Sequence, residues 1–284
     1  LTQLHTLSLA ANTRHAEVGR SMLAALCHPQ ATTTELRAFD FSNNPTPRAA
    51  IASLAQLPHL THLDLHGCGL DDGAAVQLLT TSPAPLQWLN LAIGHHHDTA
   101  PLSDATLLAL AQTPHADRLQ ALNLSGSSLS AQGFELLASA FPQLRVVVLR
   151  QVLLSNDGAA ALASAPHLQQ LQRLDLEGSR ISPHGLTLLQ RSSQLPALRH
   201  LNLAANPEVA DVDGHEALLQ SSLGQRLETL GFPNAYLRAA VRRRLGDAFP
   251  RELSVEWGRP DQYSLMTRRR FEGETVYDPL WVTA

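Results

Sequence analysis

Apolar residues recur along the chain in pairs that are separated by a single residue. Between Leu60 and Leu70 the apolar positions are Leu60, Leu63, Leu65 and Leu70, and Cys68 stands before the last of them. Because successive side chains of a strand point to opposite faces, Leu63 and Leu65 point to the same side. The pattern therefore predicts a short strand with one buried face.

The same frame recurs nine times, and its units start 24 to 33 residues apart. The first leucine of each unit is Leu4, Leu36, Leu60, Leu86, Leu119, Leu144, Leu171, Leu198 or Leu227. One match would be weak, but nine matches in register indicate an internal repeat.

The second half of several units has apolar residues at helical spacing. The segments 73–79, 133–137, 158–162 and 185–189 each begin with a glycine and continue with such residues. One unit cannot cover its own apolar face, so neighbouring units are expected to stack. Helices are wider than strands, so the stack is expected to curve with a parallel sheet on its concave side and the helices outside.

These motifs resemble the leucine-rich repeat family. Asn12, Asn44 and Asn206 stand where an amide turns inward after the strand. The following Leu-x-x-x-Gly-x-x-x-Leu, as in 129–137 and 154–162, resembles the ribonuclease-inhibitor-like class, with short units of a bacterial type. The resemblance covers residues 1–235 and implies an α/β solenoid that binds protein partners, without identifying a partner.

The repeat pattern ends before Tyr236. Residues 236–246 read as an amphipathic helix and residues 253–257 as a final strand that closes the end of the sheet. Residues 258–284 read as an irregular tail. We therefore expect two parts: a solenoid of nine units over 1–235 and a C-terminal cap over 236–284.

Composition narrows the class of protein. Of the 284 residues 44% are hydrophobic but only 5% aromatic, which suits a layered core of Leu and Ala. The net charge of -4 gives no attraction to nucleic acid or to anionic membranes, so neither is expected as a partner. There is no run of 18 apolar residues and no secretory leader, and we expect a cytoplasmic protein. The chain starts in register with a repeat, which suggests a fragment of a longer protein.

Residues beside the strand leucines are expected to face the concave surface, where two polar clusters emerge. The first consists of Asp40, His62, Asp64, His66 and Trp88, and the second of Arg150, Arg173, Asp175, Glu177 and His200. Trp and Arg are enriched at binding hot spots, so we expect these clusters to bind a partner. The alternative is that they are solvated residues of a polar sheet face.

The sequence motifs give little support for a metal site or for catalysis. Alternate residues of a strand lie about 6.6 Å apart, so His62 and His66 are too distant to close on one ion. His95–His97 is expected to be a solvated loop, and Arg242–Arg244 and Arg268–Arg270 solvated cap residues. Catalytic and phosphate-binding motifs are lacking, so we expect no enzyme, no cofactor and no metal.

The sequence thus favours a protein-interaction scaffold. The alternative is a recognition or substrate-recruiting arm of a larger enzyme or effector whose catalytic domain lies outside this chain.

Overall fold

Nine short strands form one parallel sheet in a computed structural model of the chain. The structure describes residues 4–10, 15–28, 35–93, 100–209, 217–218, 220–231, 266–271 and 274–279. The strands follow one another in chain order, from β1 to β9. They are β1 (Thr6–Ser8), β2 (Ala38–Asp40), β3 (His62–Asp64), β4 (Trp88–Asn90), β5 (Ala121–Asn123), β6 (Val146–Val148), β7 (Arg173–Asp175), β8 (His200–Asn202) and β9 (Thr229–Gly231).

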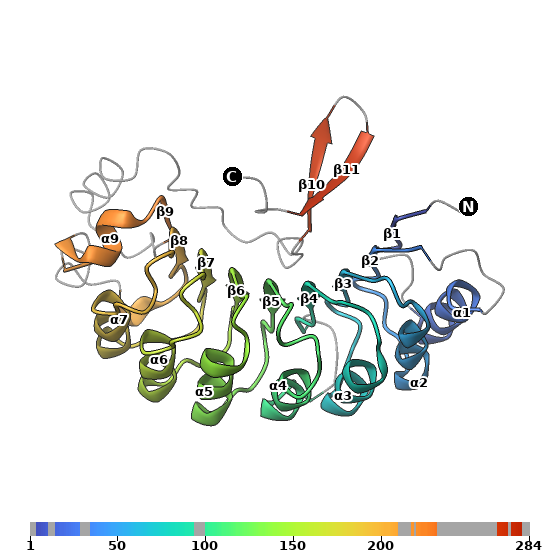
Figure 1. The fold of residues 1–284 in the computed structure, drawn as a ribbon, viewed down its shortest axis with the longest axis horizontal. Coiled ribbons are helices and arrows are strands. Elements are labelled where there is room, and N and C mark those ends of the chain that lie inside the picture. The colour runs from blue at the N-terminus through green and yellow to red at the C-terminus, as the bar shows by residue number, and fades with distance from the viewer. Residues whose placement is uncertain are drawn as a thin grey trace.

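Helical segments alternate with these strands. The α-helices are α1 (Ala16–Leu26), α2 (Arg48–Ile51), α3 (Asp72–Thr81), α4 (Asp104–Ala111), α5 (Ala131–Ala140), α6 (Asn156–Ala163), α7 (Pro183–Gln190) and α9 (Ser222–Arg226), and the 3₁₀ turns are η1 (Ala52–Gln56) and η2 (Pro207–Val209). Figure 1 shows an arc with the strands along its inner side and the helices along its outer side. The predicted α/β solenoid is confirmed.

The core lies between the sheet and the helices. The central residue of each strand pairs in register with the next, as Leu63 does with Leu89 and Leu89 with Leu122. These leucines are buried together with the leucine two residues further on, such as Leu65 and Leu124. The period-two pattern therefore places both members of each apolar pair in one continuous core.

Different side chains close the turn after each strand. The Asn44 amide donates to the carbonyl oxygens of Leu9 at 2.8 Å and Phe41 at 2.9 Å, which joins two neighbouring units. Cys68 is a buried thiol, and its Sγ donates to the Phe41 carbonyl at 3.2 Å. Ser179 Oγ donates to the carbonyl of an adjacent unit at 2.7 Å. Cys and Ser thus replace Asn in satisfying buried backbone carbonyls.

A carboxylate on one helix binds the start of the next helix. Asp72 in the first turn of α3 accepts hydrogen bonds from Ser103 N at 2.9 Å, Ser103 Oγ at 2.6 Å and Thr106 Oγ1 at 2.6 Å. Asp104 of α4 accepts from Ser130 N and Oγ in the same way. Ser103 and Ser130 are also the N-caps of α4 and α5. Each hydroxyl therefore caps its own helix and also contacts the helix of the preceding repeat.

The C-terminal part differs from the expected irregular tail. Strands β10 (Met266–Phe271) and β11 (Glu274–Pro279) pair antiparallel, with Met266 opposite Pro279. Val, Thr and aromatic residues favour strands here, and the two-residue connection between them is Glu-Gly, which suits a hairpin. The expected helix over 236–246, the strand over 253–257 and the His95–His97 loop lie outside the described residues.

Within the described part of the chain, no helix has both the length and the apolar character needed to cross a bilayer.

Candidate partner-binding face

The first and third residues of each strand project from the concave face of the sheet. In β7 the central Leu174 is buried in the core, so Arg173 and Asp175 emerge on the opposite face. The same alternation applies to every strand of the nine. The concave face therefore carries the residues that the sequence placed there.

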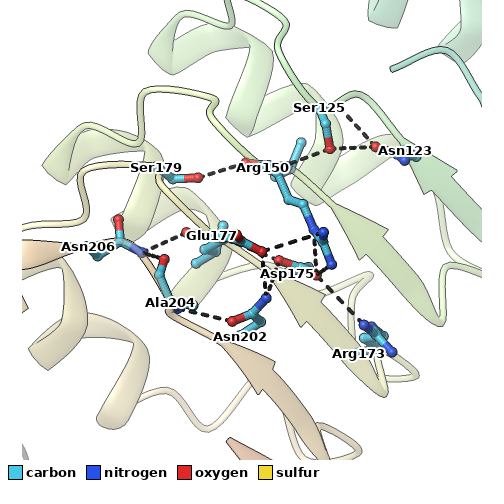
Figure 2. A network of polar contacts seen from close by, with 12 residues as sticks. Asn123, Ser125, Arg150, Arg173, Asp175, Glu177, Ser179, Asn202, Ala204 and Asn206 are labelled. Atoms are coloured by element: carbon cyan, nitrogen blue, oxygen red, sulfur yellow. Dashed lines mark hydrogen bonds and ion pairs between the residues drawn. The ribbon is translucent and has the colours of Figure 1, made fainter. Parts of the chain in front are cut away.

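Arg150 and Asp175 form the centre of the second cluster. Arg150 follows β6, and its Nε and Nη2 donate to Asp175 Oδ2 at 3.0 and 2.8 Å (Figure 2). Its Nη1 lies 3.5 Å from Glu177 Oε2. The side chain of Arg150 is 11% exposed and that of Asp175 is 0% exposed. A carboxylate buried to this degree needs such partners, because an unpaired buried charge is strongly destabilising.

Further donors complete the environment of the Asp175 carboxylate. Its Oδ1 accepts from Asn202 Nδ2 at 3.0 Å and from the Glu177 backbone N–H at 3.2 Å. Asn202 Nδ2 also lies 3.3 Å from Glu177 Oε2. Arg173 Nη2 lies 3.7 Å from Asp175 Oδ2. The network thus connects residues of three consecutive repeats.

Two charged groups of this network reach solvent. The side chains of Arg173 and Glu177 are 25% and 26% exposed. Burial lowers the pKa of the Arg173 guanidinium, an effect that the charge of Asp175 opposes. An arginine remains protonated at neutral pH all the same. His200, the last member of the cluster, hydrogen-bonds through Nδ1 to Thr229 Oγ1 at 2.9 Å.

The first cluster has a different character. His62 stacks on Trp88 with ring centroids 5.4 Å apart and an interplanar angle of 25°. Burial lowers the pKa of His62 to about 4, so the imidazole is neutral at pH 7. His62 is half-buried, whereas Asp40, Asp64 and His66 are buried. The three buried residues are therefore not solvated side chains of a polar sheet face, which was the alternative interpretation.

The two aspartates of this cluster bind within the chain. Asp40 accepts from Ser42 N at 3.0 Å and Ser42 Oγ at 2.7 Å through Oδ1, and from Ser8 Oγ at 2.9 Å through Oδ2. Asp64 accepts from His66 N at 2.9 Å and from Asn90 Nδ2 at 3.1 Å. These carboxylates fix the turn after the strand and join neighbouring strands.

This turn contact recurs, and sequence reasoning missed it. The third residue of six strands accepts a hydrogen bond from the backbone N–H two residues later; these residues are Asp40, Asp64, Asn90, Asn123, Asp175 and Asn202. Asp and Asn suit this role because their short side chains mimic a backbone turn. The recurrence of Asp or Asn at this position in the sequence was the available signal.

A group of apolar residues in the middle of the concave face was also missed. Trp88, Ala121, Val146 and Val148 form a cluster separate from the main core and are 3%, 0%, 3% and 6% exposed. We call these four residues the concave apolar patch. It lies on β4, β5 and β6, between His62 on one side and Arg173 on the other. The concave apolar patch thus begins at Trp88 of the first cluster and extends toward Arg173 of the second.

Among the described residues, no group of three or more His, Cys, Asp or Glu side chains is placed to hold a metal ion.

Comparison with known proteins gives one curated relative and distant structural likenesses. No family model matches the chain. Human leucine-rich repeat-containing protein 14 is 33% identical over 152 residues, which are 51% of this chain and 29% of that protein. The chain thus matches less than a third of the length of this relative.

Two solved structures resemble the chain over most of its length. The complex of Rad7 and Elc1 in yeast gives a TM-score of 0.45 at 13% identity, over 84% of this chain and 72% of that chain. The TLR13 complex with the RNA ssRNA13 gives 0.44 at 18% identity, over 81% and 36%. With nine repeats in register and a single parallel sheet, the chain has the architecture of a leucine-rich repeat solenoid, and the curated relative it resembles is a leucine-rich repeat protein.

Proposed function

We propose that the chain is a non-catalytic scaffold that binds a protein partner on the C-terminal half of its concave face. The contact centres on Arg173 and Glu177, with Arg150, Asp175 and His200 around them. The observation that carries the proposal is the network around Asp175, which holds charged groups of both signs in fixed positions while two of them reach solvent.

Fixed side chains favour binding because little conformational entropy remains to be lost. Arg150 is held at both of its donor edges by Asp175 and Glu177. Asn202 in turn holds the two carboxylates. A partner that meets this surface therefore does not have to order these side chains.

The charges of the cluster favour a protein over a polyanion. Two guanidinium groups, on Arg150 and Arg173, stand against the two carboxylates of Asp175 and Glu177. A surface that binds nucleic acid through phosphates carries an excess of basic residues, which this cluster does not. A protein surface that presents both hydrogen-bond donors and acceptors complements this mixed-charge cluster better than a polyanion does.

The first cluster belongs to the proposed interface as a second contact area. His62 is its accessible edge, while Asp40, Asp64, His66 and Trp88 are buried in the structure. Because Trp88 is buried, a partner can contact its ring only if neighbouring atoms of the concave apolar patch move aside.

Comparative capture tests the proposal. The chain is immobilised as wild type, Arg173→Ala and Arg191→Ala, and captured proteins are quantified by mass spectrometry. Arg191 is a matched control because it is an exposed arginine in the same repeat, at the outer end of α7. We expect a partner that Arg173→Ala loses and Arg191→Ala keeps. A partner that Arg191→Ala loses and Arg173→Ala keeps would place the interface on the convex side.

A further inference from the structure

Leu153, in the turn after β6, exposes an apolar side chain on a fixed backbone. It is 64% exposed, the largest value among the exposed large apolar residues of the described part of the chain. Its neighbours Val152 and Leu154 are buried, at 0% and 3% exposure. The Val152 N–H donates to the Leu149 carbonyl at 3.3 Å, and the Leu154 N–H donates to the Ser179 carbonyl at 2.9 Å. The backbone is therefore held on both sides of Leu153, while its side chain reaches solvent.

The repeat does not require an apolar residue at this position. Leu153 directly follows the position that Asn44 and Asn206 occupy in their repeats. In the other described repeats the same position holds Pro45, Gly69, Ser128, Arg180 and Pro207. None of these is a leucine, isoleucine, valine or aromatic residue. Because Leu153 itself buries little area, the hydrophobic core does not account for the choice of leucine here.

Gln151, two residues earlier in the same turn, has an unfavourable backbone conformation. Its φ of 57° lies in the left-handed region that favours glycine. Five other described repeats have a positive φ at this turn position, and their residues are Asn43, Gly67, Gly126, Gly178 and Ala205. Gln151 has the longest side chain of the six. It is therefore a second side chain of this turn that the backbone geometry itself does not favour.

Arg180 occupies the position of Leu153 in the next repeat. It is exposed, and it takes part in none of the ion pairs between described residues. The hydrogen bond from Leu154 to Ser179 holds the two turns side by side. Neighbouring strands lie about 4.8 Å apart, so equivalent positions of adjacent repeats are close in space. An exposed apolar side chain thus lies beside a guanidinium that has no carboxylate partner within the described part of the chain.

This turn adjoins the network around Asp175. Arg150, which donates to Asp175, directly precedes Gln151, and the Gln151 N–H donates to the Glu177 carbonyl at 2.8 Å. We call Gln151, Leu153 and Arg180 the β6 rim. Interfaces have apolar residues at their centre, yet the concave apolar patch is at most 6% exposed. Leu153 therefore offers, next to the network, the accessible apolar surface that the concave apolar patch does not.

We propose that the β6 rim binds a protein segment in which an apolar side chain stands next to a carboxylate. The apolar side chain packs on Leu153, which removes apolar area of both partners from water. The carboxylate pairs with Arg180, whose guanidinium presents two parallel donors to it. The rim is then the edge of the interface on the concave face, an assignment that rests on the proposed function.

Peptide selection with a matched depletion tests the inference. A phage-displayed library of random peptides is depleted on immobilised Leu153→Ser and then selected on the wild-type chain, and a parallel arm is depleted on Leu108→Ser. Leu108 in α4 is the matched control because it is also an exposed leucine, at 49%. We expect enrichment after depletion on Leu153→Ser alone, of peptides with an apolar residue next to Asp or Glu.

The affinity of one selected peptide, made synthetically, is then measured by fluorescence polarisation. Leu153→Ser and Arg180→Ala should each weaken its binding at least about tenfold, as for residues at the centre of a contact. Leu108→Ser should stay within about twofold of wild type. Thermal melting checks that each variant folds, and Leu153→Gln replaces Leu153→Ser if the latter does not.

Two results would overturn the inference. One is that depletion on Leu153→Ser leaves no peptide to enrich, and the other is that the selected peptide binds Leu153→Ser or Arg180→Ala as tightly as wild type. The selection uses no natural partner, so its failure is distinct from a failure of comparative capture. A partner lost by Arg173→Ala in that capture, together with a failed selection, would support the proposed function without the β6 rim.

Discussion

Arg150 donates from both Nε and Nη2 to a single carboxylate oxygen of Asp175, 25 positions later in the sequence. One residue follows β6 and the other ends β7, so this contact joins two repeats across the concave face. The carboxylate is fully buried, and its stability depends on the donors around it. The pair therefore has a structural role as well as its proposed role in binding.

Replacing Arg150 tests this coupling. Arg150→Ala removes the closest charge partner of Asp175 but leaves Arg173 and Asn202 in place. We expect a loss of about 2–4 kcal/mol in the free energy of unfolding, measured by urea denaturation. The double variant Arg150→Ala/Asp175→Ala should lose less than the sum of the single variants, because no buried charge is then left unpaired. Strictly additive losses would show that the pair is not coupled.

Asp72 gives a stability contribution that depends on pH. Burial raises the pKa of Asp72, but hydrogen bonds from Ser103 and Thr106 outweigh burial and bring the pKa below its usual 3.8. A carboxylate with a lowered pKa stabilises the fold above its unfolded value, and this contribution is lost as the pH falls through the folded value.

Asp72→Ala should therefore destabilise the fold by about 1–2 kcal/mol at pH 7. The difference from wild type should shrink as the pH falls below 3.8, as followed by thermal melting across the acid range. A difference that is the same at all pH values would contradict the role of the ionised carboxylate.

The stacked imidazole of His62 should resist protonation. Burial lowers its pKa from 6.5 to about 4. Between these two values the unfolded chain binds a proton that the folded chain does not, so the contribution of His62 to stability falls as the pH drops through this window. NMR titration of the imidazole should show a midpoint near 4, and Trp88→Ala should raise it toward 6.5. A midpoint near 6.5 in the wild type would mean that the ring is solvated.

The strands could be predicted from the sequence almost residue by residue. Each observed strand, such as Arg173–Asp175, contains the first residue of an expected apolar pair, here Leu174, because period-two alternation depends only on neighbouring residues. Parallel stacking places equal positions of adjacent repeats side by side, as it does Arg173 and His200, and the role of the second cluster in binding stays a prediction.

Contacts that do not follow from the period-two alternation could not be predicted from the sequence in this way. The alternation places Trp88 on the concave face, but it cannot show that the side chain is only 3% exposed there. Asp64 was expected to be available to a partner, yet it is hydrogen-bonded to a backbone N–H two residues later. Such competition between a partner and the protein's own backbone depends on the turn geometry, which apolar periodicity does not describe.

The assignment of residues 236–284 as a cap remains a prediction that truncation tests. Removing them should leave the last repeat without a cover and lower the melting temperature of the chain, with aggregation visible by light scattering. A soluble, monomeric truncation that melts at the wild-type temperature would contradict the cap.

The affinity of the captured partner for two single arginine variants tests the central claim most directly. By isothermal titration calorimetry at fixed ionic strength, Arg173→Ala should weaken binding at least about tenfold, as for a residue at the centre of an interface. Arg191→Ala, on the outer side of the same repeat, should stay within about twofold of wild type. Wild-type affinity for Arg173→Ala, together with a clear loss for Arg191→Ala, would contradict binding on the concave face.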